Sequence, residues 1–216
     1  MSKQNLDNSN SHMAVLAEFE KLIKSPIPPV GAVDEDTLGF FAEGGRLIAL
    51  GIPRKNLKSI PESIGNLVDL KELHLARNSI KSLPKSISNL QNLRILNLSG
   101  NEFKSLPDAI GDLANLESLN LLANELSELP KSIGKLKNLK KLILQQNKLK
   151  TLPDSIAELT NLKILNLMMN QLKKLPESMT ALRTLEILNL QNNNLPASIE
   201  TLIMNLKRNG CKVIYP

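Results

Sequence analysis

The sequence predicts an α/β solenoid: a curved horseshoe with a parallel sheet on its concave face and short helical turns on its convex face. The first observation is a 23-residue period that recurs seven times without insertion, from residues 47, 70, 93, 116, 139, 162 and 185. The second is that each repeat has a strand-like half and a helix-like half. The third is that only 2% of the residues are aromatic, so aliphatic side chains must build the core.

The shared pattern of the repeats is LxxLxLxxNxLxxLPxxIxxLxx, and it is clearest in the five central copies. In the first of these, Leu73 and Leu75 alternate at a period of two, which is typical of a short strand with one buried face. Leu83, Ile87 and Leu90 then fall on one face of a helical turn that a proline opens. One repeat buries too little to offset the entropy of ordering its backbone, so the repeats must stack.

An asparagine follows each predicted strand, at the point where the chain turns inward. The amide of such a residue bonds backbone groups of its own coil and of the next coil, which would otherwise be buried without partners. We therefore expect a structural asparagine ladder through the stack, made of Asn78, Asn101, Asn124, Asn147, Asn170 and Asn193.

The two ends of the solenoid need caps, because a terminal repeat would expose its aliphatic face. The sequence divides into four segments: a disordered tail or vector-derived remnant (1–12), an N-terminal helical cap and connector (13–46), the seven repeats (47–195), and a C-terminal cap helix with a closing strand (196–216). The tail is predicted because Ser11-His12-Met13 resembles a cloning scar. The connector is acidic, and residues 1–46 carry seven acidic and four basic groups.

The repeat resembles those of the leucine-rich repeat superfamily. Its LPxxIxxL half is most similar to the intracellular class of Ras-interacting scaffolds and bacterial repeat proteins, and the resemblance covers residues 47–205. It implies a protein that binds protein partners through its concave sheet. The partner stays unknown, with a small GTPase and a host protein as candidates. Extracellular members usually carry cysteine-rich caps, whereas this chain has one cysteine, Cys211, which implies an intracellular origin.

Side chains that point out of the concave sheet are the candidates for partner binding. An apolar band, weighted to the C-terminal half, consists of Ile95, Leu122, Ile143, Ile164, Met168, Met169 and Ile187. Exposed aliphatic and methionine side chains often mark a protein-binding surface, although a tolerated hydrophobic strand is the alternative. The polar candidates on the same face are Glu72, His74, Asn97, Asn120, Lys141 and Asn166. For the asparagines among them a structural role is favoured, because they are common in this class of repeat.

Other kinds of chemistry find little support. The repeat register places no nucleophile beside His74, Cys211 is expected to be a packed thiol, and the sequence has no phosphate-binding loop or metal-ligand cluster. We therefore predict no catalytic residue, metal or cofactor. A lysine column is expected to be a solvated edge, and without stacking aromatic residues it predicts no nucleic-acid partner. The column consists of Lys58, Lys81, Lys104, Lys150 and Lys173.

The cellular location is predicted from two kinds of apolar segment that the sequence lacks. No stretch reaches the ~18 apolar residues of a membrane span, and the N-terminus has no secretory apolar region. A monomer in the cytoplasm is expected, with secretion by a signal-less route left open. The leading hypothesis is a non-enzymatic protein-interaction module. The alternatives are a bacterial effector or substrate-targeting part of a larger enzyme, and a passive self-associating scaffold.

Overall fold

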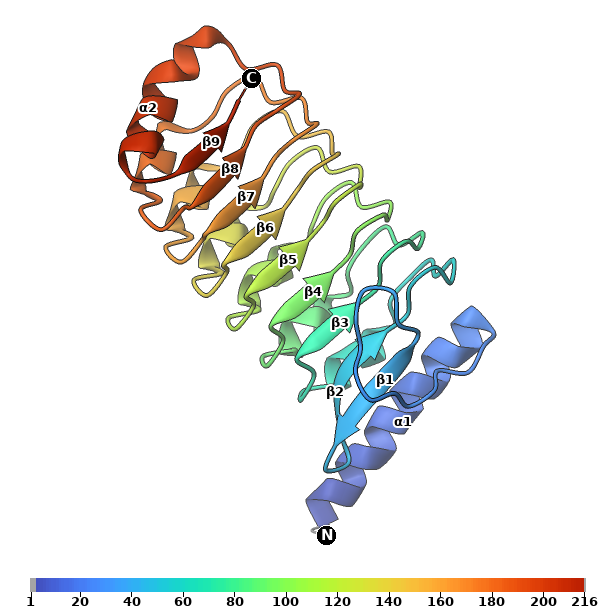
Figure 1. The fold of residues 1–216 in the computed structure, drawn as a ribbon. Helices are drawn as coiled ribbons and strands as arrows, with labels where there is room; N and C mark the ends of the chain where they lie inside the picture. The colour runs from blue at the N-terminus through green and yellow to red at the C-terminus, as the bar shows by residue number, and fades with distance from the viewer. Residues whose placement is uncertain (1–2, 216) are drawn as a thin grey trace.

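The computed structural model describes residues 3–215 as one stack of coils with a continuous sheet along one side (Figure 1). Nine strands lie in the sheet in the order of the sequence. Strand β1 pairs antiparallel with β2, and each later strand pairs parallel with the one before it. The strands are β1 (Gly39–Glu43), β2 (Arg46–Gly51), β3 (Glu72–His74), β4 (Ile95–Asn97), β5 (Ser118–Asn120), β6 (Lys141–Ile143), β7 (Ile164–Asn166), β8 (Ile187–Asn189) and β9 (Lys212–Ile214).

Strands β2 to β8 are those of the seven predicted repeats. Their register follows the period of the sequence, so that Leu73 pairs with Leu96 and Leu96 pairs with Leu119. The inward leucines of each repeat, such as Leu73 and Leu75, are fully buried. They join one continuous core from end to end, because each coil covers the aliphatic side chains of its neighbours. The predicted solenoid is confirmed.

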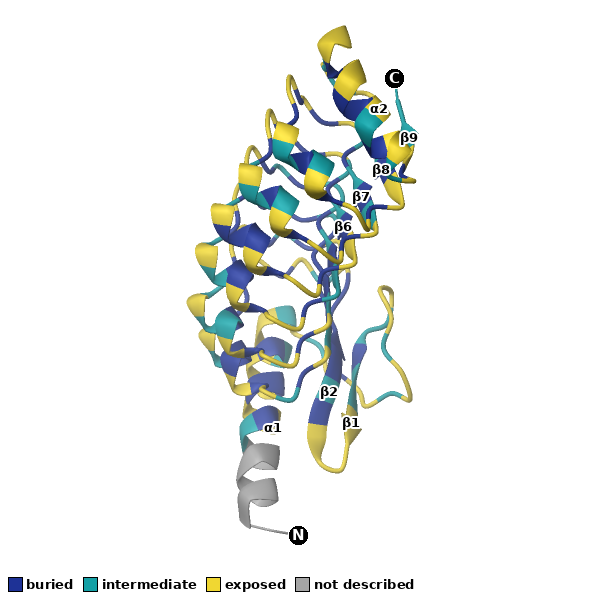
Figure 2. Cartoon of the chain, turned by 90° about the vertical axis from the view of Figure 1, so that its left-hand side faces the viewer, coloured by how far each residue is buried: buried dark blue, intermediate teal, exposed yellow. Residues whose placement is uncertain are grey.

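The convex half of each repeat is a short 3-10 helix, and Figure 2 shows these turns along one side of a gently bowed stack, with the strands on the inner side. The preceding proline has an extended backbone, with ψ between 134° and 160°, so it caps the turn instead of opening it as predicted. The turns are η1 (Glu62–Asn66), η2 (Lys85–Asn89), η3 (Asp108–Asp112), η4 (Lys131–Lys135), η5 (Asp154–Glu158), η6 (Glu177–Ala181) and η7 (Ala197–Ile199).

The N-terminal cap differs from its prediction in where it begins. Helix α1 (Lys3–Ile23) starts ten residues before Met13, so the predicted tail is corrected for residues 3–12, while residues 1–2 lie outside the described part. His12 is only 3% exposed, and its Nδ1 accepts a hydrogen bond of 3.3 Å from the backbone N–H of Leu47. This contact docks the middle of α1 on the solenoid. The vector origin of these residues stays a prediction.

The connector also carries structure that the sequence did not predict. Its last residues form β1, which pairs with β2 as a hairpin. With β1 at one edge and β9 at the other, the sheet is two strands wider than the seven repeats alone. At the other end, helix α2 (Glu200–Arg208) and β9 lie where a cap helix and closing strand were predicted. Leu202, Ile203 and Leu206 of α2 are buried against the last repeats.

Candidate functional site

The outward side chains of the strands lie in rows along the concave sheet. Each strand pairs in parallel with the same positions of the next repeat, 23 residues further along the chain, so residues at the same repeat position are direct neighbours. One row consists of Glu72, Ile95, Ser118, Lys141, Ile164 and Ile187, and the next consists of His74, Asn97, Asn120, Ile143, Asn166 and Asn189. Met168 and Met169 follow β7. The structure therefore places the predicted binding residues on one surface.

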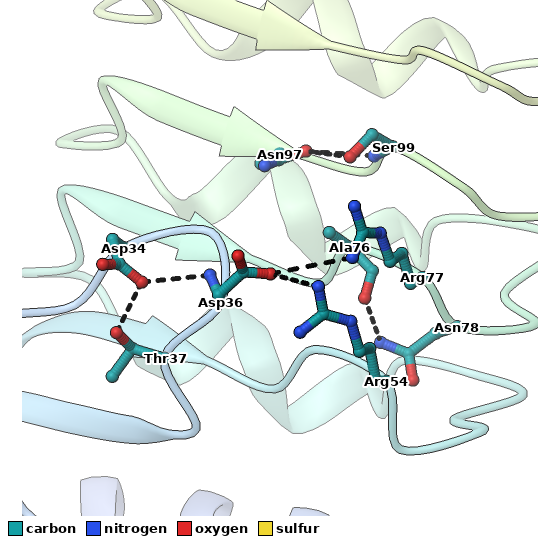
Figure 3. A network of polar contacts seen from close by, with 9 residues as sticks. All are labelled: Asp34, Asp36, Thr37, Arg54, Ala76, Arg77, Asn78, Asn97 and Ser99. Atoms are coloured by element: carbon teal, nitrogen blue, oxygen red, sulfur yellow. Dashed lines mark hydrogen bonds and ion pairs between the residues drawn. The ribbon is translucent and has the colours of Figure 1, made fainter.

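A loop covers the N-terminal part of this surface. Residues 31–38, which we call the connector loop, fold back over the first strands (Figure 2). The carboxylate of Asp36 lies 2.7 Å from the Arg54 guanidinium and 4.0 Å from that of Arg77 (Figure 3). Asp34 accepts hydrogen bonds from the Thr37 hydroxyl, at 2.5 Å, and from the backbone N–H of Asp36, at 3.0 Å. These bonds, the one from Thr37 first, hold the pKa of Asp34 below its ordinary value.

Cover of the concave face by this loop was not predicted from the sequence, although two signals were present. Arg54 and Arg77 occupy the eighth position of their repeats, and Asp34-Glu35-Asp36 forms an acidic run of opposite charge in the connector. Gly51 stands at an outward strand position where later repeats carry larger side chains. The glycine leaves room for the loop, because a Cβ there would lie 2.8 Å from Cγ1 of Val33.

Cover by the connector loop divides the predicted site in two. Toward the N-terminus, His74 is 7% exposed and Asn97 is 4% exposed. Toward the C-terminus, Met169 and Ile187 are 41% and 36% exposed. We call this part the C-terminal patch; it consists of these two exposed residues and of the half-buried Ile143, Ile164 and Met168. Leu122 lies between the two parts and lines a cavity beneath the connector loop.

The outward asparagines hold the backbone at the ends of the strands. Asn97 accepts hydrogen bonds from the backbone N–H and the hydroxyl of Ser99, at 3.0 and 2.8 Å (Figure 3). Asn120 and Asn166 accept in the same way from the N–H two residues further along, at 3.0 and 3.1 Å. Since their carbonyl oxygens are occupied, these residues shape the concave surface more than they offer free acceptors to a partner.

The inward asparagine that follows strands β3 to β8 links its own coil to the preceding coil. In one example, Oδ1 of Asn124 accepts from the backbone N–H of Phe103 at 3.1 Å. Its Nδ2 donates to the carbonyl oxygens of Leu98, at 3.0 Å, and Leu121, at 3.1 Å. The same pattern of contacts recurs at Asn78, Asn101, Asn147, Asn170 and Asn193. These residues satisfy buried backbone groups and face away from the concave surface.

A second ladder, which the sequence analysis missed, runs along the exposed side of the turns. The last residue of each central repeat donates to a carbonyl oxygen of the preceding repeat, as Asn138 does to Ala114 at 3.0 Å. Asn92, Asn115 and Asn161 make the equivalent bond at 2.8–2.9 Å. The signal was an asparagine at the final position of the repeat, which the leucine pattern leaves undefined.

The described residues offer little to catalysis. Cys211 is buried, and burial raises the pKa of its thiol to about 11, so the thiolate that a nucleophile needs is not formed at neutral pH. Among the side chains that the structure describes, residues 11–215, no three His, Cys, Asp or Glu gather closely enough to hold a metal ion. None of the helices in residues 3–215 combines the length and apolar content that crossing a membrane requires.

Comparison with known families agrees with the geometry. A model described as a leucine-rich repeat region matches residues 45–123 and 85–149, and a second leucine-rich repeat model matches residues 137–195. The chain belongs to the leucine-rich repeat family. Proteins of this family and fold typically act as interaction modules and not as enzymes. No curated protein sequence matches this leucine-rich repeat chain.

Solved structures of other leucine-rich repeat proteins resemble the chain. A leucine-rich repeat protein of Leptospira interrogans matches with a TM-score of 0.71 and 37% identity, over 78% of this chain and 42% of its own. The plant peptide hormone receptor RGFR1, in complex with RGF2, matches with a TM-score of 0.64 and 27% identity, over 77% of this chain and 27% of its own. The ectodomain of the Arabidopsis thaliana receptor kinase GASSHO1, in complex with CASPARIAN STRIP INTEGRITY FACTOR 2, matches with a TM-score of 0.53 and 30% identity, over 69% and 22%. This chain therefore spans less than half of these relatives.

Proposed function

We propose that this leucine-rich repeat protein is a non-enzymatic module that binds a segment of a protein partner on the C-terminal half of its concave face. The observation that carries the proposal is the C-terminal patch, in which Met169 and Ile187 are exposed and Ile143, Ile164 and Met168 are half-buried, on a part of the sheet face that no described segment of the chain covers. The N-terminal half of the same face is covered by the connector loop. Apolar side chains concentrated on an open surface are typical of interaction sites.

The chemistry of the patch suits a protein partner. Met168 and Met169 are flexible and polarizable, so they adapt to the shape of an incoming side chain. Ile164 and Ile187 are direct neighbours in one row of the sheet, and Ile143 belongs to the next row. Two of the similar receptor structures were solved with RGF2 and CASPARIAN STRIP INTEGRITY FACTOR 2 bound, which supports a protein or peptide ligand for this fold. The cytoplasmic location and the monomeric state stay predictions.

The test compares three forms of the protein in capture experiments from lysates of the source cell and of a host cell. The first form is the wild type. The second carries Ile143→Asp, Met168→Asp and Ile187→Asp, which place charges on the C-terminal patch. The third carries Val68→Asp and Met204→Asp, which charge two exposed apolar side chains off the concave face, 43% and 51% exposed. Circular dichroism and thermal melting establish that all three are folded.

We expect a protein that the wild type and the Val68/Met204 variant retain and the patch variant loses. Hydrogen exchange with that protein bound should then slow at β6 to β8. Equal retention by all three folded forms would contradict the proposal and move the site elsewhere. Light scattering over a range of concentrations tests the competing scaffold hypothesis, since a self-associating protein gains mass as its concentration rises.

A further inference from the structure

The row of side chains that contains Ile164 and Ile187 has a lysine at each end. Lys141 of β6 is the register partner of Ile164, and Lys212 of β9 is the register partner of Ile187. Register partners in a parallel sheet project from the same face, so the four side chains form one line across strands β6 to β9 (Figure 1). Both lysines are exposed. This half of the concave face thus presents an apolar pair between two cations.

The chain does not balance the charge of these two lysines. Neither Lys141 nor Lys212 takes part in an ion pair among the described side chains. The outward positions of strands β5 to β9 hold no aspartate or glutamate. Glu117 and Glu186, which directly precede β5 and β8, already bind neighbouring lysines at 2.5 and 2.8 Å. A partner that matches this half of the face therefore carries negative charge.

The N-terminal half of the concave face shows how the solenoid holds an acidic segment. There the connector loop lies over the sheet, and Asp36 binds Arg54 at 2.7 Å and Arg77 at 4.0 Å (Figure 3). The two arginines belong to consecutive repeats, so the chain docks one acidic segment through cations of neighbouring coils. Lys141 and Lys212 offer the same kind of anchor to a second segment, Lys141 at the margin of the connector loop and Lys212 three strands beyond it.

We infer that the C-terminal patch, together with Lys141 and Lys212, binds an acidic segment of the partner in which one carboxylate stands on each side of an apolar residue. The inference rests on the proposed function and deepens it, since it gives the charge and spacing of the partner. The lysines are three strand spacings apart, about 14 Å at ~4.8 Å per strand.

The spacing of the lysines defines the segment. An extended chain advances about 3.4 Å per residue, so two carboxylates four residues apart span the distance between Lys141 and Lys212. Because side chains of an extended chain alternate between two faces, the residue midway between the carboxylates points to the same side as they do. It lies over Ile164 and Ile187, and an apolar side chain there buries their exposed surface.

The test uses three synthetic peptides with blocked termini and NMR spectra of the protein labelled at its isoleucine methyl groups. The peptide GESLSEG has two glutamates four residues apart around a leucine. GQSLSQG replaces both with glutamine, and GSEELSG has the same composition as the first in another order. We expect GESLSEG to shift the signals of Ile164 and Ile187 in a saturable manner. Half-saturation should need about tenfold more GQSLSQG, which loses two exposed ion pairs, and about threefold more GSEELSG, which reaches one lysine at a time.

Variants of the protein test the two anchors separately. Lys141→Gln and Lys212→Gln should each raise the concentration of GESLSEG for half-saturation about threefold, as expected for one exposed ion pair. Lys150→Gln is the matched control, because Lys150 is an exposed lysine of the edge column and its loss changes the net charge equally. That variant should bind the peptide as the wild type does.

Equal binding of GQSLSQG would overturn the inference and leave the patch as an apolar surface without a preference for charge. An equal effect of Lys150→Gln would also overturn it, since binding would then depend on the net charge alone. An oligothymidylate of similar length that binds as tightly as GESLSEG would show that any polyanion suffices, and signals of Ile164 and Ile187 that respond to no peptide would reject the site. The proposed function fails by a different result, equal capture by all three folded forms, so the two outcomes are separate.

Discussion

The carbonyl oxygen of Thr37 lies so close to Gly51 that a Cβ atom at residue 51 would be 2.2 Å from it. The connector loop therefore rests directly on the backbone of β2, with no side chain between them. This contact closes the N-terminal half of the concave face, and it leaves the C-terminal patch as the open part. The width of one methyl group at Gly51 thus controls how much of the sheet a partner can reach.

Gly51→Ala should lift the connector loop from the sheet. The added methyl group cannot fit beneath the Thr37 carbonyl, so we expect the free energy of unfolding to fall by about 1–3 kcal/mol. Hydrogen exchange of the amides of Asp36 and Thr37 should become faster. Gly31→Ala is the control, because a Cβ at Gly31 meets nothing within 4 Å. Unchanged exchange in the Gly51 variant would show that this contact does not hold the loop.

Asn124→Ala should destabilise the solenoid far more than Asn138→Ala. Asn124 is 7% exposed, and its removal leaves the buried backbone groups of Phe103, Leu98 and Leu121 without their partner. We expect a loss of about 2–4 kcal/mol in urea denaturation. Asn138 donates one hydrogen bond on the exposed side, so its loss should cost about 1 kcal/mol or less. Equal losses would mean that the two ladders contribute alike.

Gln146→Gly should stabilise the protein. The eighth residue of every repeat has positive φ, and Gln146 adopts φ 56° with an exposed side chain. An L residue in this region is strained, and glycine is not. Glycine also loses more conformational entropy on folding, which offsets part of the relief, so we expect the free energy of unfolding to rise by about 0.5–1 kcal/mol. Gln171→Gly is the matched control, since Gln171 is exposed but does not have positive φ. That variant should lose stability, and a loss in both would refute the argument from strain.

Stability should decrease with acid in a way that depends on His12. Burial lowers the pKa of His12 from 6.5, so the folded protein binds fewer protons at this ring than the unfolded chain does. Its contribution is therefore complete above pH 6.5 and is lost as the pH falls below that value. We expect the free energy of unfolding to decrease by about 1 kcal/mol for each unit by which the pKa is lowered. Urea denaturation between pH 7.5 and pH 5 measures this decrease.

His12→Gln provides the control for this pH dependence. The amide does not titrate, and its oxygen replaces Nδ1 as an acceptor for the N–H of Leu47. Its denaturation profile should be flatter below pH 6.5 than that of the wild type. Two parallel profiles would assign the acid sensitivity to other groups.

Most of the repeat architecture was predictable from the sequence, because leucines recur at the same positions of every repeat and their side chains are stable only when they point into the core. Leu73 and Leu75 fix a buried strand face, and Asn78 marks the turn that follows. Helix α1 was predicted to be too short, since the burial of His12 depends on Leu47, a residue 35 positions away. A contact of that kind leaves no periodic signal in the chain.

The sequence by itself determined the stack, its register and the residues that point out of the concave sheet, because a strict 23-residue period leaves one way to bury every leucine. Only the tertiary structure decided which of those outward residues are open. The connector loop lies outside the period, and its position depends on Gly51, Arg54 and Arg77 together. Cover of a surface is a relation between distant segments, and a local pattern of residues does not encode it.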